Sequence, residues 1–267
     1  MIDVHCHLNF HAYEKDVDDV IQKAFDAGVE KIINVGTKHD SSQWAVDLAQ
    51  KYEQLYAIVG VHPHHADKHD LSSNWIEELE KIAKQPKVLA IGEIGLDYFR
   101  YQSNGVVDVA LQKEVFEAQI MLAHKLKLPL QIHNRHAGKD VLEILKHHKN
   151  YLQKIPGMFH CFAGDMEILK GVLDLGFYVG FDGNSTYKGL APGETVELSE
   201  LARNTPMDRI VTETDSPFLT PEPHRGTRNM PAYVIIVGEF LAKIKGVSFA
   251  EFEQQSVTNA KKLFALE

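Results

Sequence analysis

The sequence is poor in cysteine, in long apolar runs and in positive charge, and each shortage excludes a class of protein. Cys6 and Cys161 are the only cysteines among 267 residues, too few for a disulfide-stapled secreted domain. No apolar run approaches the ~20 residues that a membrane helix needs. Lys and Arg number 28 against 37 Asp and Glu, a formal charge of −9 that argues against broad nonspecific binding to duplex nucleic acid.

The remaining composition is that of an ordinary globular protein, with 44% hydrophobic and 24% charged residues. A chain of this length can bury roughly 70–75% of its unfolded surface, enough for a full apolar core. No Gly/Ser linker and no short repeat interrupts it, so we expect a single domain over residues 1–267. No signal-peptide pattern follows Met1, so we expect a cytoplasmic protein. Nothing indicates a membrane or an obligate protein partner.

Short apolar runs alternate with longer amphipathic stretches along the whole chain. The runs are typical of strands buried on both faces, and they cover residues 2–8, 31–36, 55–62, 88–96, 128–133, 157–162, 177–181 and 209–214. Helical spacing of apolar residues is clearest over 16–27, 107–126, 165–175 and 232–244. Strands alternating with helices at this length predict a single (β/α)₈ TIM barrel, an α/β fold. The competing open doubly wound sheet usually has a Gly-rich loop after its first strand, and none is present.

Histidines and carboxylates gather where the predicted strands end. The chain has 15 histidines. The residues at or near strand ends are His5, His7, Glu93, His133, His160 and Asp215. In a barrel of this kind the carboxyl ends of the strands form the active-site face, so we expect these side chains to meet there.

A set of two carboxylates and four histidines indicates metal binding. Alternate residues of a strand share a face, so His5 and His7 can point together into the barrel mouth while Cys6 points toward the helices. The set exceeds the needs of one tetrahedral ion, and it suits two divalent ions that share a bridging carboxylate. Ligands of mixed nitrogen and oxygen character accept Mg²⁺, Mn²⁺ or Zn²⁺. The sequence therefore predicts a two-metal hydrolytic site.

The chain resembles the TatD family of metal-dependent hydrolases, within the amidohydrolase-like superfamily. The resemblance extends over nearly the whole sequence. It is carried by DVHCHL at 3–8, GVHPH at 60–64, GEIGLDY at 92–98, LPLQIHNR at 128–135, FHCFAG at 159–164, ETDSPFL at 213–219, PHRGTRN at 223–229 and NAKKLF at 259–264. One segment departs from the family pattern, because Asn184 and Ser185 are more polar than expected after the seventh strand.

The resemblance implies a divalent-metal nuclease, usually supported by Mg²⁺ or Mn²⁺ and commonly removing nucleotides from a 3′ end of DNA. By similarity, one ion is held by His5, His7 and Asp215 and the other by His133 and His160, with Glu93 as the bridge. We expect Asp215 to act as the general base that accepts the proton of the attacking water, and Glu93 to be the second catalytic residue. The expected substrate is DNA, single-stranded or at frayed ends.

Basic residues near the predicted mouth are candidate contacts to substrate phosphate. Guanidinium groups match phosphate oxygens, although each could instead pair locally with a carboxylate. The candidates are His62, His64, Arg135, Lys188, Arg225 and Arg228. Asp97 could orient a ligand histidine or cap the loop that follows it.

Two other functions use the same residues. A small-molecule amidohydrolase would cleave C–N or ester bonds with the same metals, but it would have no obvious use for Arg135, Arg225 and Arg228. A non-catalytic metal-binding protein would not be expected to retain an intact base, whereas Asp215 is present.

Overall fold

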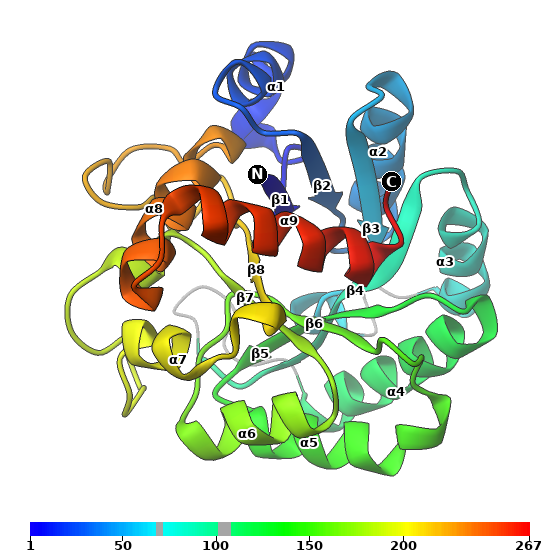
Figure 1. The fold of residues 1–267 in the computed structure, drawn as a ribbon. Coiled ribbons are helices and arrows are strands. Elements are labelled where there is room, and N and C mark those ends of the chain that lie inside the picture. The colour runs from blue at the N-terminus through cyan, green and yellow to red at the C-terminus, as the bar shows by residue number, and fades with distance from the viewer. Residues whose placement is uncertain (68–71, 101–107) are drawn as a thin grey trace.

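A computed structural model describes residues 1–67, 72–100 and 108–267. Within them, eight parallel strands form one sheet in chain order, each hydrogen-bonded to the next. The strands are β1 (Ile2–Cys6), β2 (Lys31–Val35), β3 (Leu55–Val59), β4 (Val88–Asp97), β5 (Leu130–Arg135), β6 (Gly157–Phe159), β7 (Tyr178–Phe181) and β8 (Ile210–Thr212). Figure 1 shows the strands at the centre of the molecule with the helices around them. The predicted TIM barrel is confirmed.

The barrel closes where the chain leaving β8 meets β1. The Asp215 backbone N–H donates to the His5 carbonyl oxygen at 2.9 Å, and the His7 N–H donates to the Ser216 carbonyl oxygen at 2.8 Å. The Asp3 carboxyl group accepts hydrogen bonds from the Thr214 hydroxyl and backbone N–H, at 2.7 and 3.0 Å. The open doubly wound alternative is therefore excluded, because the first and last strands are joined.

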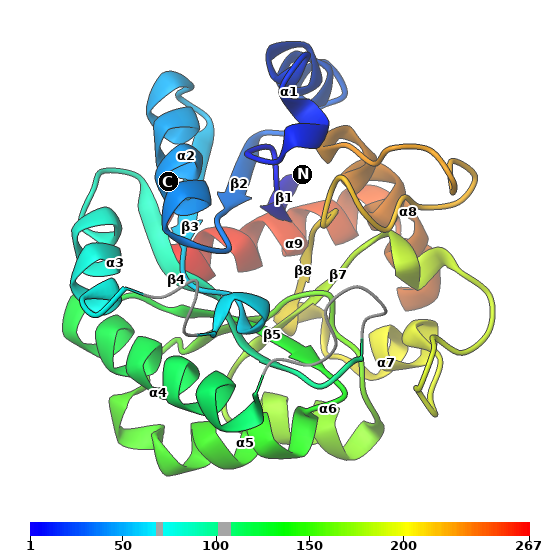
Figure 2. The ribbon, with the colours of Figure 1, turned by 180° about the vertical axis from the view of Figure 1, so that it is seen from behind.

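The helices cover the outside of the barrel, and the last one covers an end. They are α1 (Val17–Asp26), α2 (His39–Lys51), α3 (Trp75–Ala83), α4 (Val109–Leu126), α5 (Gly138–His147), α6 (Met166–Asp174), α7 (Leu198–Asn204), α8 (Val234–Lys245) and α9 (Phe249–Phe264). Figure 1 shows α9 crossing in front of the strands, and Figure 2 shows it behind them. Among the helices of the described ranges, none has the length and apolarity to span a membrane.

The core has an inner and an outer shell. Side chains of alternate strand positions fill the barrel and are closed off at the amino-terminal end by Leu263 and Phe264 of α9. A larger outer shell packs between the strands and the surrounding helices, and Cys6 belongs to it. Both cysteines are free thiols. Because α9 covers one end, only the carboxyl ends of the strands are left for a site.

Two strands are interrupted by a one-residue register shift. Between Asp3 and Cys6, three residue steps of β1 lie opposite two residue steps of β2. Between Ile91 and Ile94, three residue steps of β4 likewise lie opposite two of β5. Such a bulge lets two consecutive residues face the same side of a sheet. Both shifts lie beside residues of the predicted metal site.

The predicted elements agree with the observed ones, and the differences lie at their ends. The apolar run predicted as 55–62 stops being a strand after Val59, and the helix predicted from 232 begins at Val234 after a 3₁₀ turn at Pro231–Tyr233. The helix predicted over 107–126 begins at residue 107, which lies outside the described residues. In the structure, α4 begins at Val109. Element ends are set by local hydrogen bonds that apolar periodicity does not report.

Candidate metal centre

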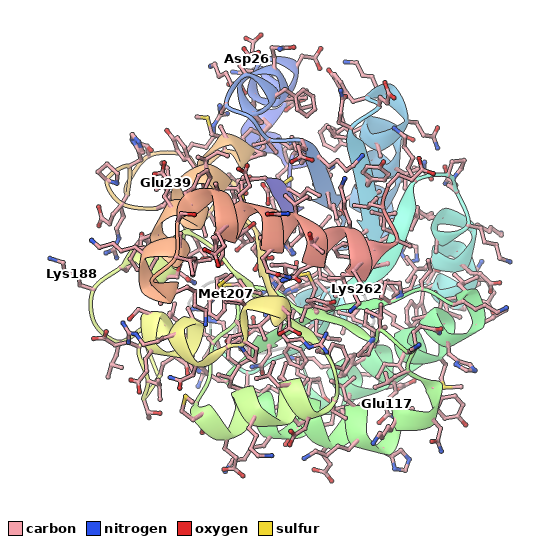
Figure 3. The ribbon with its side chains drawn as sticks, viewed as in Figure 1. Asp26, Glu117, Lys188, Met207, Glu239 and Lys262 are labelled. Carbon is pink, nitrogen blue, oxygen red and sulfur yellow. The ribbon has the colours of Figure 1, made fainter. Side chains whose placement is uncertain are left out.

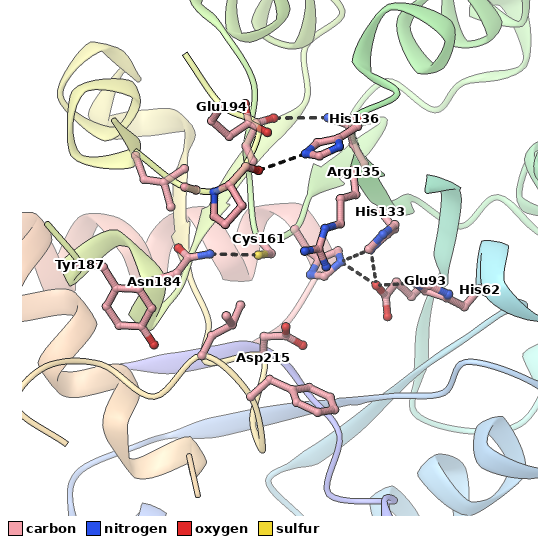
Figure 4. A pocket seen from close by; sticks show the side chains of 18 of the residues that line it. His62, Glu93, His133, Arg135, His136, Cys161, Asn184, Tyr187, Glu194 and Asp215 are labelled. Atoms are coloured by element: carbon pink, nitrogen blue, oxygen red, sulfur yellow. Dashed lines mark hydrogen bonds and ion pairs between the residues drawn. The ribbon is translucent and has the colours of Figure 1, made fainter. Parts of the chain in front are cut away.

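The six predicted ligands converge at the carboxyl ends of the strands. His5 lies on β1, Glu93 on β4 and His133 on β5; His7 and His160 follow β1 and β6 directly, and Asp215 is the third residue after β8. The set is His5, His7, Glu93, His133, His160 and Asp215. Figure 4 shows Glu93 beside His133 and Asp215 nearby, in a cavity of about 700 Å³. The volume lies within the range of ordinary ligand pockets.

His5, His7 and Asp215 form the first half of the centre. The Nε2 atoms of His5 and His7 are 3.0 Å apart, and Asp215 Oδ1 lies 3.5 and 3.4 Å from them. His7 Nδ1 donates to the Val35 carbonyl oxygen at 2.9 Å, which leaves the lone pair of the neutral ring on Nε2. Two ring nitrogens and a carboxylate oxygen that face one point fit a divalent cation.

Glu93 lies between this half and a second one. Its Oε2 is 3.8 Å from His5 Nε2 and 3.7 Å from His7 Nε2. Its Oε1 is 2.7 Å from both His133 Nδ1 and His160 Nε2. One carboxylate thus presents a different oxygen to each histidine pair, the arrangement that a bridging ligand requires.

The protonation states of Glu93 and His5 suit a cation. Burial alone would raise the pKa of Glu93, but His160, His62 and His133 outweigh it and hold that pKa well below its usual value. Burial, with the rings of His160 and His7, holds the pKa of His5 well below its usual value. An ionised carboxylate and a neutral imidazole are the forms that ligate metals.

Asp97 fixes the orientation of His133. Asp97 Oδ2 lies 3.1 Å from His133 Nε2, on the ring edge opposite Glu93. Burial would lower the pKa of His133, but Asp97 and Glu93 outweigh it and raise that pKa to about 9. Asp97 Oδ1 also accepts from the Phe99 N–H at 2.9 Å. The Asp97 carboxylate therefore orients a ligand histidine and also caps the loop that follows it, the two roles that the sequence left open.

His62 and His64 lie against the same two carboxylates. His62 Nε2 is 3.4 Å from Glu93 Oε1, and His64 Nε2 is 2.9 Å from Asp97 Oδ2. Burial lowers the pKa of His62 to about 3, so its ring is neutral. Both side chains line the cavity, as a contact to substrate would require.

Three of the four predicted cationic contacts line the cavity. Arg225 lies with Cζ 3.9 Å from the centroid of the Tyr187 ring, and Arg135 with Cζ 4.0 Å from that of Phe99. Lys188 is exposed at the rim and projects outward in Figure 3. Arg228 is not among the lining residues. Arg228 instead forms an ion pair with Asp16, with Nη1 3.0 Å from Oδ1. Of its two predicted roles, the structure therefore shows the local ion pair with a carboxylate.

A group of buried acids lies next to Asp215. Glu213 is fully buried, and its Oε1 accepts from the Cys161 N–H. Burial raises the pKa of Glu213 well above its usual value and that of Asp182 to about 7. Alternation along the chain indicates that Glu213 shares a face with Asp215, whereas the nearness of Asp182 comes from the fold and leaves no local signal in the sequence.

The segment that departs from the family pattern lies beside the centre. Asn184 Nδ2 donates to Cys161 Sγ at 3.3 Å, a contact drawn in Figure 4. Ser185 Oγ donates to the Asp182 carbonyl oxygen at 2.6 Å, closing a 3₁₀ turn over Gly183–Thr186. The two unexpected polar residues therefore satisfy local hydrogen bonds, and Asn184 also lines the cavity.

Comparison with known proteins shows the family to which the chain belongs. The family model "TatD related DNase" matches residues 2–265. A Bacillus subtilis relative described as the uncharacterized metal-dependent hydrolase YabD is 37% identical, over 100% of this chain and 99% of its own. A relative from Escherichia fergusonii, described as the 3′-5′ ssDNA/RNA exonuclease TatD, is 33% identical over 100% and 99%. The crystal structure of the Escherichia coli TatD homologue YJJV superposes with a TM-score of 0.89, at 28% identity over 100% and 98%.

The family model and the relatives place the chain among the metal-dependent hydrolases. The chain belongs to the TatD-related DNase family, as its sequence motifs indicated.

Proposed function

We propose that the protein is a divalent-metal-dependent phosphodiesterase that removes nucleotides from the 3′ end of single-stranded DNA. The observation that carries the proposal is the divided environment of Glu93, with one oxygen toward His5 and His7 and the other toward His133 and His160. A pair of metal ions on the two sides of one carboxylate suits phosphoryl transfer, because both the attacking and the leaving oxygen carry charge.

Each side chain of the centre has a defined part in the proposal. His5, His7 and Asp215 would hold one ion, His133 and His160 the other, and Glu93 would bridge them. When bound, Mg²⁺, Mn²⁺ or Zn²⁺ supplies Lewis-acid activation of water and of the phosphodiester. Asp97 holds the His133 ring in place, and the His7 ring is held by the Val35 carbonyl group.

Asp215 is the proposed general base. Both carboxylates of the centre line the cavity, and the Asp215 side chain is the more exposed of the two, at 14% against 5% for Glu93. The water oxygen bonds to phosphorus and its proton passes to an Asp215 carboxylate oxygen. The bond from phosphorus to the leaving oxygen breaks, its electron pair stays on that oxygen, and the oxygen takes up a proton from solvent.

The cationic wall supports a phosphodiester over a neutral amide. Arg225, Arg135 and Lys188 line the cavity that contains Asp215. Their positive charge has a use with a phosphate chain and none with an uncharged amide. The E. fergusonii relative is named for action on single strands, which agrees with this substrate class.

The first test replaces the base. Asp215→Asn should lower the rate constant of cleavage of a labelled single-stranded DNA by roughly 10²- to 10⁴-fold, because the attacking water loses its proton acceptor. Asp174→Asn is the matched control, since Asp174 is an exposed carboxylate of α6 paired with Lys170. Circular dichroism should show both variants folded. Retention of most of the activity by Asp215→Asn would refute its assigned role.

The second test asks which bond is broken. Wild type and His133→Ala are assayed with Mg²⁺, Mn²⁺ and Zn²⁺ on end-labelled single-stranded DNA and on a panel of amides. The proposal predicts a ladder of products shortened from the 3′ end, lost in His133→Ala, and no amide cleavage. Amide cleavage without DNA cleavage would establish the amidohydrolase function instead.

A further inference from the structure

The cavity of the metal centre carries exposed apolar side chains that the hydrolytic chemistry does not use. Leu190 and Phe218 are 57% and 51% exposed, the two highest values for large apolar residues in the described part of the chain. Both line this cavity. Large apolar groups exposed beside a site indicate a binding surface, because their burial by a ligand is favourable.

Phe218 is connected to a metal-ligand histidine by ring contacts. The Phe10 ring stacks on the His7 ring with centroids 4.4 Å apart and an interplanar angle of 14°. The Phe218 ring meets Phe10 edge to face, with centroids 6.1 Å apart. The Phe218 N–H donates to the Asp215 carbonyl oxygen at 2.9 Å, so this aromatic residue and the proposed base share one turn.

The turn that carries Phe218 is held by a buried amide side chain. Asn229 Nδ2 donates to the carbonyl oxygens of Phe218 and Thr214, at 2.6 and 2.8 Å, and Asn229 is fully buried. The Asn229 N–H donates to the Pro217 carbonyl oxygen at 3.2 Å. An aromatic group on a turn fixed in this way loses little conformational freedom when a ligand stacks on it.

A cation lies on another wall of the same cavity. Tyr187 is fixed by the hydrogen bond from its hydroxyl to the Thr220 carbonyl oxygen, at 2.8 Å, and Arg225 covers its ring. In Figure 4, Tyr187 and the Glu93 cluster lie on opposite sides of Asp215. The cavity therefore combines a fixed exposed aromatic ring, a guanidinium group and a centre suited to phosphate. A nucleotide of a flexible single strand offers a flat ring and phosphates that match all three.

We propose that Phe218, supported by Phe10, is a stacking platform for the unpaired nucleobase at the 3′ end of the strand. The proposal rests on the nuclease function proposed above and adds to it the means by which an unpaired end is selected. Every base has a π face, so stacking tolerates any sequence, but a base paired inside a duplex does not present that face.

The test combines one change in the protein with one change in the DNA and measures kcat/KM for all four combinations. Two single strands labelled at the 5′ end differ only in that one carries a tetrahydrofuran residue without a base at its 3′ end. With Mn²⁺-loaded protein, Phe218→Ala should lower kcat/KM by roughly tenfold on the strand with the base, mainly through KM. On the strand without the base it should change kcat/KM less than twofold.

Two further variants separate stacking from general damage. Phe218→Trp keeps a flat ring and should keep wild-type kcat/KM on both strands. Tyr151→Ala removes an exposed aromatic side chain outside the cavity and should change neither value. Binding of both strands to EDTA-treated protein, measured by fluorescence anisotropy, should repeat the roughly tenfold loss for Phe218→Ala on the strand with the base alone.

The possible failures are distinguishable. If Phe218→Ala lowers kcat/KM equally on both strands, or on neither, the platform is refuted while the nuclease function stands. If the wild-type protein cleaves neither strand with any of the three metals, the nuclease function fails and the platform is rejected with it.

Discussion

At the scale of single residues, the centre depends on carboxylates that each serve two neighbours. Glu93 faces both histidine pairs, and Asp97 holds His133 while it also contacts His64. Asp97 itself lies away from Glu93, on the outer edge of the His133 ring. Carboxylates that hydrogen-bond the far nitrogen of a ligand histidine raise its basicity and fix the orientation of its ring.

Loss of the Asp97 charge should weaken metal binding without removing a ligand. Asp97→Asn is expected to lower the affinity for Mn²⁺ by roughly 10- to 100-fold, because His133 loses the anion that orients it. Isothermal titration calorimetry of the metal-stripped protein measures this directly. Asp16→Asn, which removes a partly exposed carboxylate outside the cavity, is the matched control. Equal affinity in Asp97→Asn and wild type would show that Asp97 has no part in the centre.

At the scale of elements, the bulge of β1 opposite β2 and the bulge of β4 opposite β5 position the ligands. Ile2 and Val4 face the barrel interior, so strict alternation along β1 would turn His5 toward the helices. The register shift between Asp3 and Cys6 restores the inward direction from His5 onward. The shift in β4 does the same for Glu93, whose neighbour Ile94 packs in the outer shell.

Asp3, at the β1 bulge, should make stability depend on pH. Burial raises its pKa from 3.8 to about 8, against the opposing hydrogen bonds of Thr214. Between these values the folded protein holds a proton that the unfolded chain releases. The free energy of unfolding should therefore fall as pH rises from about 4 to about 8, by up to about 1.4 kcal/mol per pH unit from this group.

The variant Asp3→Asn imitates the protonated side chain and should remove this contribution. Urea unfolding at pH 5, 6, 7 and 8 gives the free energies for both proteins. Wild type should lose stability relative to Asp3→Asn as pH rises. Parallel curves would mean that Asp3 keeps the same charge in the folded and unfolded protein.

The bulges also mark the limit of what the sequence could predict about the site. The spacing of His5 and His7 correctly indicated that they share a face, because that inference needs only local alternation. The inward direction of Glu93 could not be derived from periodicity, since it depends on the shift against β5. The ion pair between Arg228 and Asp16 could not be predicted either, because the two residues are far apart in the sequence.

At the scale of the whole molecule, one end of the barrel is closed by apolar packing and the other end holds the site. Helix α9 packs Leu263 and Phe264 onto the amino-terminal end, and the carboxyl ends of the strands hold the polar centre. The fold was predictable from the alternation of apolar runs, because parallel strands buried on both faces leave a strong signal. The stacking platform was not predictable, because exposure of Phe218 depends on the closed barrel and on the turn held by Asn229.

The central claim is that the closed barrel brings six side chains together to hold a pair of cations with Glu93 between them. The most direct measurement is anomalous X-ray scattering from crystals soaked in Mn²⁺. Two peaks are predicted, one beside His5, His7 and Asp215 and the other beside His133 and His160, each within ligand distance of Glu93. A single peak, or peaks only at another group such as His62 and Asp97, would contradict the account.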